Sequence, residues 1–333
     1  MRKAVVLMGM LGAALSVPLA AQSYISVFDS ISDVKPIDGT TQTEDIKFRD
    51  DDADRMTVAV ELSGQGPYRF LVDTGADRTA LSTEVADRLK LPRGVSARLH
   101  SVAGVQEVQT VTVSSLRLTS RPIRVANAPL LSEFHMGADG ILGVDSLKSQ
   151  RVMFDFKANT MSVVPSVQRL LPEDKDRDTI VVTARQRNGR LVLTNARVDD
   201  NNVAVVLDTG SQVTIGNAAL RSKLLRGNRR AMDRLGLVRL RSVTGDELIG
   251  EYMVVKKLEI GGATLTNLSV VFADAHTFRQ LKLDKGPAML LGMNAMRAFD
   301  RVSIDFANKK LRLMLPEHSS SSEGVMFASR LTW

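Results

Sequence analysis

Two copies of the tripeptide Asp-Thr-Gly each follow an apolar segment that reads as a strand. The first lies in FLVDTGADRTALS and carries Asp73, and the second lies in VVLDTGSQVTIG and carries Asp208. An aspartate at the end of a rigid strand, in a turn eased by glycine, is well placed for chemistry. Two carboxyl groups about 3 Å apart cannot both ionise, so they share one proton. One can then take a proton from water while the other donates to a carbonyl oxygen.

A single Asp-Thr-Gly is a common turn, but the surrounding sequence repeats as well. RLHSVAG at 98–104 is answered by RLRSVTG at 239–245, and ILGVDSLKSQRVMFDF at 141–156 by LLGMNAMRAFDRVSIDF at 290–306. Three blocks recur in the same order, at a period far longer than the 20 to 50 residues or so of solenoid repeats. We therefore predict a duplicated lobe. Asp73 and Asp208 would then be equivalent points that can meet on a pseudo-two-fold axis.

This set of motifs resembles the aspartic protease superfamily, and more narrowly the retropepsin-like enzymes of bacteria, over about residues 56–315. The resemblance implies an all-β fold, mainly β with short helices. It implies two retropepsin-like lobes in one chain, related by a pseudo-two-fold axis. It also implies an aspartic endopeptidase in which Asp73 and Asp208 form the catalytic pair. Such a pair requires no metal and no organic cofactor, so none is expected.

In that family each lobe supplies a catalytic loop, a hairpin flap over an extended peptide, and an apolar-apolar-glycine segment behind the loop. The implied loop residues besides the aspartates are Thr74, Gly75, Ala76, Thr209, Gly210 and Ser211. The implied flap residues are Ser101, Val102, Ala103, Gly104, Ser242, Val243, Thr244 and Gly245. The implied backing residues are Ile141, Leu142, Gly143, Leu290, Leu291 and Gly292. Neither hairpin carries the tyrosine of the pepsin flap, which favours the retropepsin comparison.

The two loops diverge after the glycine, where Ala76 stands in the first and Ser211 in the second. A hydroxyl beside Asp208 could bond its carboxylate and favour ionisation, whereas Asp73 lacks that help. We therefore expect an asymmetric pair that works nearer neutral pH than one with two such hydroxyls. Other catalytic schemes lack their motifs, because no HExxH, GxSxG or GxxxxGK occurs. The four histidines are scattered in sequence, and His100, beside the first flap, is expected to be a surface residue.

Length and composition fit a globular protein of two units: 333 residues with 44% hydrophobic residues. Short β-branched runs separated by turn residues begin near Met56 and are typical of strands. The lead-in is polar and reads as a linker or irregular segment; a metal loop in its acidic run RDDDADR would lack the usual glycine turn. The expected divisions are 1–21 signal peptide, 22–55 polar lead-in, 56–165 N-terminal lobe, 166–179 linker, 180–316 C-terminal lobe and 317–333 serine-rich tail, which could add an edge strand.

The first residues are typical of export, because Arg2 and Lys3 precede an apolar run that closes in Ala20-Ala21. An uncleaved membrane anchor is the alternative. The absence of cysteine excludes disulfides and thiolate chemistry and suits a periplasm. The net charge is +7, and the basic segment 221–234 reads as a solvated helix face or, alternatively, a contact for an anionic membrane or acidic partner. Nucleic acid is not expected as a partner.

The expected partner is an extended peptide or an envelope protein being processed, and the expected state is a monomer. Two rival interpretations remain open at this stage. The first is a protease-shaped scaffold of the cell envelope that grips peptides without cutting them. The second keeps catalysis but pairs each lobe with its equivalent in another chain, which a mass measurement in solution distinguishes.

Overall fold

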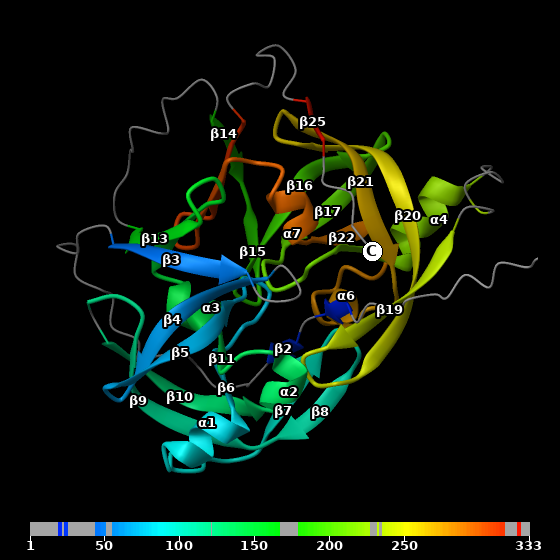
Figure 1. The fold of residues 1–333 in the computed structure, drawn as a ribbon. Coiled ribbons are helices and arrows are strands. Elements are labelled where there is room, and N and C mark those ends of the chain that lie inside the picture. Colours follow the sequence, from blue (N-terminus) through cyan, green and yellow to red (C-terminus); the bar gives the residue numbers. More distant parts are fainter. Residues whose placement is uncertain are drawn as a thin grey trace, which may run out of the picture.

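The computed structural model describes residues 19–21, 23–25, 44–50, 55–120, 122–166, 179–226, 232, 235–316 and 325–327. Figure 1 shows two β-rich lobes side by side, the N-terminal one in blue to green and the C-terminal one in green to orange. Strands dominate and the helices are short, so the predicted all-β, two-lobed retropepsin-like fold is confirmed.

The N-terminal lobe is built from strands whose apolar residues alternate. In β4, Val58, Val60 and Leu62 are buried while Ala59 and Glu61 are exposed, as the two-residue period of a strand requires. The strands are β4 Met56–Leu62, β5 Gln65–Val72, β6 Ala80–Ser82, β7 Ala97–Ser101, β8 Val105–Val108, β9 Thr110–Arg117, β10 Pro122–Leu131 and β11 Gly140–Leu142. The helices are α1 Thr83–Arg88, α2 Glu133–Met136 and α3 Val144–Leu147.

The C-terminal lobe repeats this plan. Its strands are β15 Arg185–Arg187, β16 Arg190–Val198, β17 Asn201–Leu207, β18 Thr214–Gly216, β19 Gly236–Ser242, β20 Glu247–Ile260, β21 Ala263–Phe272 and β22 Ala288–Leu291. Its helices are α4 Ala218–Leu225, α6 His276–Gln280 and α7 Met293–Met296. In each lobe a short strand, β11 or β22, runs parallel to the strand before the aspartate and antiparallel to the next. The sequence repeat is therefore a structural repeat.

The symmetry axis of the two lobes passes through a sheet that both lobes share. The sheet runs in the order β14 Thr179–Thr183, β24 Lys310–Met314, β23 Arg301–Asp305, β12 Gln150–Asp155, β13 Thr160–Pro165 and β3 Glu44–Asp50. The repeat-equivalent strands β12 and β23 pair antiparallel, Arg151 with Asp305 and Asp155 with Arg301, about a central Met153–Ser303 pair. Two equivalent strands paired in this way are related by a two-fold axis through that central pair.

Parts of the predicted lead-in and tail form strands. Glu44–Asp50 is β3, which pairs with β13 and β4, so the expectation of an irregular lead-in was wrong there. Its IKF stretch alternates apolar and basic residues, as the two-residue period of a strand requires. In the tail, β25 Val325–Phe327 adds a parallel edge strand to β21. Most of the predicted signal, lead-in and linker lies outside the described residues, including Asp51 to Asp54 of the acidic run.

Candidate functional site

Asp73 and Asp208 occupy matching positions at the ends of β5 and β17. The backbone N–H of Asp73 donates to the carbonyl of Leu142 at 3.0 Å, and that of Asp208 donates to the carbonyl of Leu291 at 3.1 Å. Both aspartates are almost completely buried, with 2% and 0% of their surface exposed. Each acid is thus held by the strand that precedes it and by the short strand that pairs with it.

The two threonines join the lobes directly. The Thr74 N–H donates to Thr209 Oγ1 at 3.0 Å, and the Thr209 N–H donates to Thr74 Oγ1 at 3.1 Å. Each hydroxyl also donates across the junction, Thr74 to the Leu207 carbonyl at 3.1 Å and Thr209 to the Val72 carbonyl at 2.7 Å. These four reciprocal bonds, all buried, fix one loop in register with the other.

The apolar-glycine segments lie directly behind the two loops. A Cβ on Gly143 would come within 2.3 Å of the Arg78 carbonyl carbon, and one on Gly292 within 2.3 Å of the Val213 carbonyl oxygen. Only glycine allows this approach. The residues that follow continue the support: the Val144 N–H donates to the Ala76 carbonyl and the Met293 N–H to the Ser211 carbonyl, both at 2.8 Å.

Burial dominates the electrostatics of Asp73. It raises the pKa of Asp73 from 3.8 to about 7, against opposing contributions from its hydrogen bonds and from the charges of Arg190 and Arg55. One carboxylate oxygen accepts the N–H groups of Gly75 at 2.7 Å and Ala76 at 2.8 Å. The Asp73 carboxyl group is therefore protonated up to about pH 7, although backbone donors stabilise its charged form.

Arg190 reaches from the C-terminal lobe into the loop of the N-terminal lobe. Its side chain is fully buried, its Nε donates to the Gly75 carbonyl at 2.7 Å, and its Nη2 lies 3.0 Å from the Asp77 carboxylate. Burial raises the pKa of Asp77 to about 6, and the charge of Arg190 opposes that rise. The equivalent Arg55 is also buried and donates to the Met136 carbonyl at 2.9 Å.

The two glycine-tipped hairpins each insert into the opposite lobe. Val102, at the β7–β8 tip, is buried among Val213, Ile215, Leu290 and their neighbours in the C-terminal lobe. Val243, at the β19–β20 tip, is buried among residues of the N-terminal lobe that include Ala76, Ala80 and Ile141. The Gln106 side chain donates to the Asp246 carboxylate at 2.6 Å and links one hairpin to the other.

Hydrogen bonds also close the tips themselves. The Ser101 N–H donates to the Gly104 carbonyl, while the N–H groups of Ala103 and Gly104 donate to Ser101 Oγ. At the second tip the Gly245 N–H donates to the Ser242 carbonyl, and the hydroxyls of Ser242 and Thr244 lie 2.9 Å apart. The eight predicted flap residues thus form two equivalent tips that cross the junction between the lobes.

Comparison with known families matches each half of the chain to an aspartyl protease. Residues 58–149 match the family described as "gag-polyprotein putative aspartyl protease", and residues 194–295 match the family described as "Aspartyl protease". The chain belongs to the retropepsin-like aspartic protease superfamily. DNA damage-inducible protein 1 of Eremothecium gossypii is 27% identical over 122 residues, which are 35% of this chain and 25% of that protein. The chain therefore matches about a quarter of that relative's length.

One feature of this retropepsin-like chain differs from the sequence-based expectation. The Ser211 hydroxyl donates to the Val213 carbonyl at 2.8 Å. The expectation that this hydroxyl bonds to the Asp208 carboxylate was therefore wrong. A short loop that turns back on itself presents an acceptor in its own backbone. The four loop residues after the threonines are all buried: Gly75, Ala76, Gly210 and Ser211. The Ser211 hydroxyl stabilises its own loop.

Three of the four histidines, scattered in sequence, gather at the hairpins. His100 is partly buried; its Nδ1 lies 2.9 Å from His276 Nε2, and the two rings stack with centroids 5.1 Å apart, so His100 contacts the other lobe. The His276 N–H donates to the Val102 carbonyl at 2.8 Å. His135 occupies the matching place on the other side, where a Cβ on Gly245 would come within 2.6 Å of its ring. Burial, followed by the charge of His276, lowers the pKa of His100.

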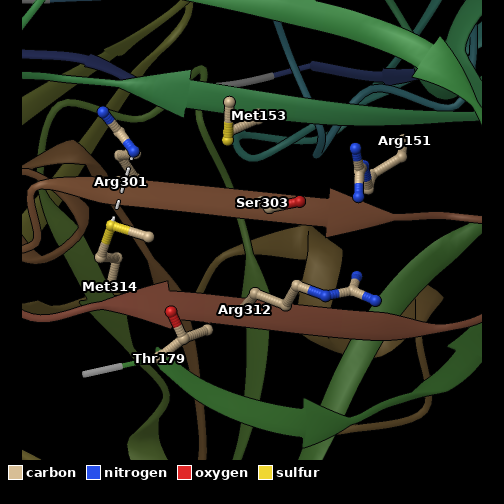
Figure 2. Close-up of a pocket in the computed structure, with 7 residues that line it drawn as sticks. All are labelled: Arg151, Met153, Thr179, Arg301, Ser303, Arg312 and Met314. Carbon is tan, nitrogen blue, oxygen red and sulfur yellow. Dashed lines mark hydrogen bonds between the residues drawn. The ribbon is translucent and has the colours of Figure 1, made fainter. Parts of the chain in front are cut away.

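A pocket on the shared sheet contains none of the predicted site residues (Figure 2). It is lined by Arg151, Met153, Thr179, Arg301, Ser303, Arg312 and Met314. Two of its arginines face carboxylates of the same sheet: Arg301 Nε lies 2.5 Å from Asp155, and Arg312 Nη1 lies 3.9 Å from Asp305. These two ion pairs hold neighbouring strands of the sheet together. Among the described residues, no group of three or more His, Cys, Asp or Glu side chains could hold a metal ion.

Several residues that surround the aspartates were not predicted from the sequence. Arg55 and Arg190 stand equally far before Asp73 and Asp208, and this equal spacing was the available signal. Thr79 and Thr214 were a second matched pair: their hydroxyls accept the N–H groups of Gly143 at 3.1 Å and Gly292 at 3.2 Å. Because each pair follows the duplication, alignment of the two halves would have found both.

Proposed function

We propose that this chain is a single-chain aspartic endopeptidase in which Asp73 and Asp208 act together on one water molecule. The observation that carries the proposal is the reciprocal exchange of hydrogen bonds between Thr74 and Thr209. It supports a site at the junction of the lobes, because it ties together the two residues that directly follow the aspartates. The membership of both halves in aspartyl protease families supports the same activity.

The protonation states of the two aspartates suit attack by water on an amide. With its pKa raised to about 7, Asp73 holds the shared proton and donates it to the carbonyl oxygen of the peptide bond. Asp208 takes a proton from the water as the water oxygen attacks the carbonyl carbon. The tetrahedral intermediate then collapses, its C–N bond breaks, and the amine leaves with a proton from the pair. This scheme uses only carboxyl groups of the chain itself.

The hairpins β7–β8 and β19–β20 act as flaps in this proposal. Each tip buries a valine in the opposite lobe, so the pair closes over the junction where the aspartates lie. An extended peptide between flaps and floor gains backbone hydrogen bonds as an added strand would. Closure also excludes bulk water from the reacting bond.

We further propose that the protein is exported to a periplasm and works as a monomer on peptides or envelope proteins. The basic start followed by an apolar run, and the lack of cysteine, support export. The part of the chain that the structure describes contains no helix long and apolar enough to cross a membrane. In the basic segment Arg221 pairs with Glu251, which supports a solvated helix face for its described portion.

The test is cleavage of a diverse peptide library by wild type, Asp73→Asn and Asp208→Asn, with Asp87→Asn as a control. Asp87 is an exposed aspartate that pairs with Arg93 at the end of α1, away from the lobe junction. We expect cleavage by wild type and by the control only. Peptide binding without cleavage by all four chains would instead support a scaffold that grips peptides.

A further inference from the structure

Two strands from the start of the described chain pair with the two flaps. β1, Leu19–Ala21, lies parallel to β19, with Leu19 opposite Leu240, Ala20 opposite Arg241 and Ala21 opposite Ser242. β2, Ser23–Ile25, lies antiparallel to β7, with Ser23 opposite Ser101, Tyr24 opposite His100 and Ile25 opposite Leu99. Figure 1 shows these strands in dark blue at the centre of the molecule, near β7 and β19.

The partner residues are equivalent positions of the sequence repeat. RLHS at 98–101 and RLRS at 239–242 match residue for residue, so Ser101 corresponds to Ser242 and Leu99 to Leu240. Ala21 and Ser23 therefore pair with equivalent serines, and Leu19 and Ile25 pair with equivalent leucines. The two sets of pairs are equally far along the sequence from residue 22. The pairing thus has the symmetry of the lobes.

The mixed strand directions follow from the same symmetry. A two-fold axis reverses any direction perpendicular to it, so equivalent flap strands run in opposite senses across the cleft. A straight chain that crosses the axis must then be parallel to one flap strand and antiparallel to the other. β1 and β2 do this, each on the hairpin edge that β20 or β8 leaves free. This is the pairing that an extended peptide adding a strand to both flaps would have.

We infer that the segments Leu19–Ala21 and Ser23–Ile25 are an intramolecular ligand of the cleft, bound along the path that a substrate peptide takes between the flaps. The inference rests on the proposed function, because it uses the proposed flaps as the binding surface. It adds that the uncleaved chain carries its own competitor, and that an extended peptide of the type LAAQSYI fits the cleft.

The size of the competition follows from the covalent link. A ligand attached through a flexible linker has an effective concentration on the order of 1 mM. If the free segment binds with a Kd of about 0.1 mM, its attachment weakens the binding of an added peptide ~10-fold. Removal of the N-terminal segment would relieve this competition.

The experiment measures peptide binding in the Asp208→Asn background, so that no peptide is cut. Three chains are compared: the full chain, made by cell-free translation without membranes so that its leader stays attached, a chain lacking residues 1–25, and a full-length chain with residues 19–25 replaced by alternating glycine and serine. The last keeps the length and the leader but lacks the proposed ligand. The probes are a fluorescent peptide of residues 16–28 and an unrelated peptide that wild type cleaves. Circular dichroism checks that all three chains fold alike.

We expect the full chain to bind both probes at least ~10-fold more weakly than the two altered chains, which should bind them equally well. Equal affinity in all three chains would overturn the inference while leaving the proposed function intact. Failure of wild type to cleave any peptide, together with no binding to any chain, would instead remove the proposed function and this inference with it.

Discussion

Thr74 and Thr209 exchange hydrogen bonds across the junction of the lobes, each N–H donating to the other hydroxyl at 3.0 to 3.1 Å. Each hydroxyl then donates to the strand that carries the opposite aspartate. The contact couples the geometry of one acid to the geometry of the other, so a change at either threonine should affect both loops.

Replacing Thr74 or Thr209 with valine should lower the free energy of unfolding. The substitution preserves shape but leaves a buried N–H and a buried carbonyl without their partner, at about 1–3 kcal/mol for each group. Urea unfolding curves measure the loss, and Thr→Ser, which keeps the hydroxyl, is the matched control. Because the residues share one network, the double variant should lose less than the sum of the singles. Valine variants within about 0.5 kcal/mol of wild type would show that the exchange is not needed.

Substitution of Arg190 should affect both stability and the pH profile. Arg190→Met leaves Asp77, whose side chain is only 16% exposed, without its cross-lobe cation, and breaking a buried pair costs about 3–5 kcal/mol. The charge of Arg190 lowers the pKa of Asp73, so its loss should raise that pKa and move the alkaline limb of kcat/KM to higher pH. Adding Asp77→Asn should restore part of the stability without restoring the pH profile. A pH profile of kcat/KM that does not move in Arg190→Met would show that the charge of Arg190 does not affect the pKa of Asp73.

The raised pKa of Asp73 predicts a specific pH dependence. Activity that needs a protonated Asp73 should fall as pH rises through about 7. The stability of the fold also depends on pH. Between about pH 4 and 7 Asp73 keeps its proton in the folded state and has released it in the unfolded state. The contribution of Asp73 to the free energy of unfolding therefore falls, and the fold becomes less stable, as pH rises across that window. Unfolding of wild type and Asp73→Asn at a series of pH values should show the advantage of wild type shrinking from pH 4 to 7. A constant difference would contradict the assignment.

The flap tips should control peptide affinity. Val102→Ala removes two methyl groups that are buried in the opposite lobe, which weakens closure over a bound peptide. We expect KM to rise several-fold with a smaller change in kcat. Val105→Ala, on the same hairpin but 46% exposed, is the control and should behave like wild type. Equal kinetics of the two variants would mean that Val102 does not hold the flap in the working enzyme.

The sequence predicted those features that depend on local pattern and on duplication. Alternating apolar residues marked β4, and the repeated Asp-Thr-Gly identified loops whose symmetry the Thr74–Thr209 contact now displays. β3 was missed because the polar residues around Ile46 and Phe48 hide a short strand, which pairs with β13 on one side and with β4 on the other.

The contacts between the lobes could not be predicted from the sequence, because they depend on how the two lobes pack together. The partner of His100 lies far along the chain in α6, and no pattern around His100 specifies which surface of the other lobe it meets. Ser211 shows the same limit over a short distance, since its choice of the Val213 carbonyl depends on the path of the loop.

The central claim is that one acid from each lobe acts on a single water molecule. Its most direct measurement is the affinity of two peptide analogues built on a cleaved sequence, one with a hydroxyl-bearing tetrahedral carbon at the cleaved bond and one with a plain methylene. A mimic of the transition state should bind wild type at least ~100-fold more tightly than the methylene peptide. We predict that this advantage disappears in both Asp73→Asn and Asp208→Asn. An advantage absent from wild type, or lost in only one of the two variants, would contradict the account.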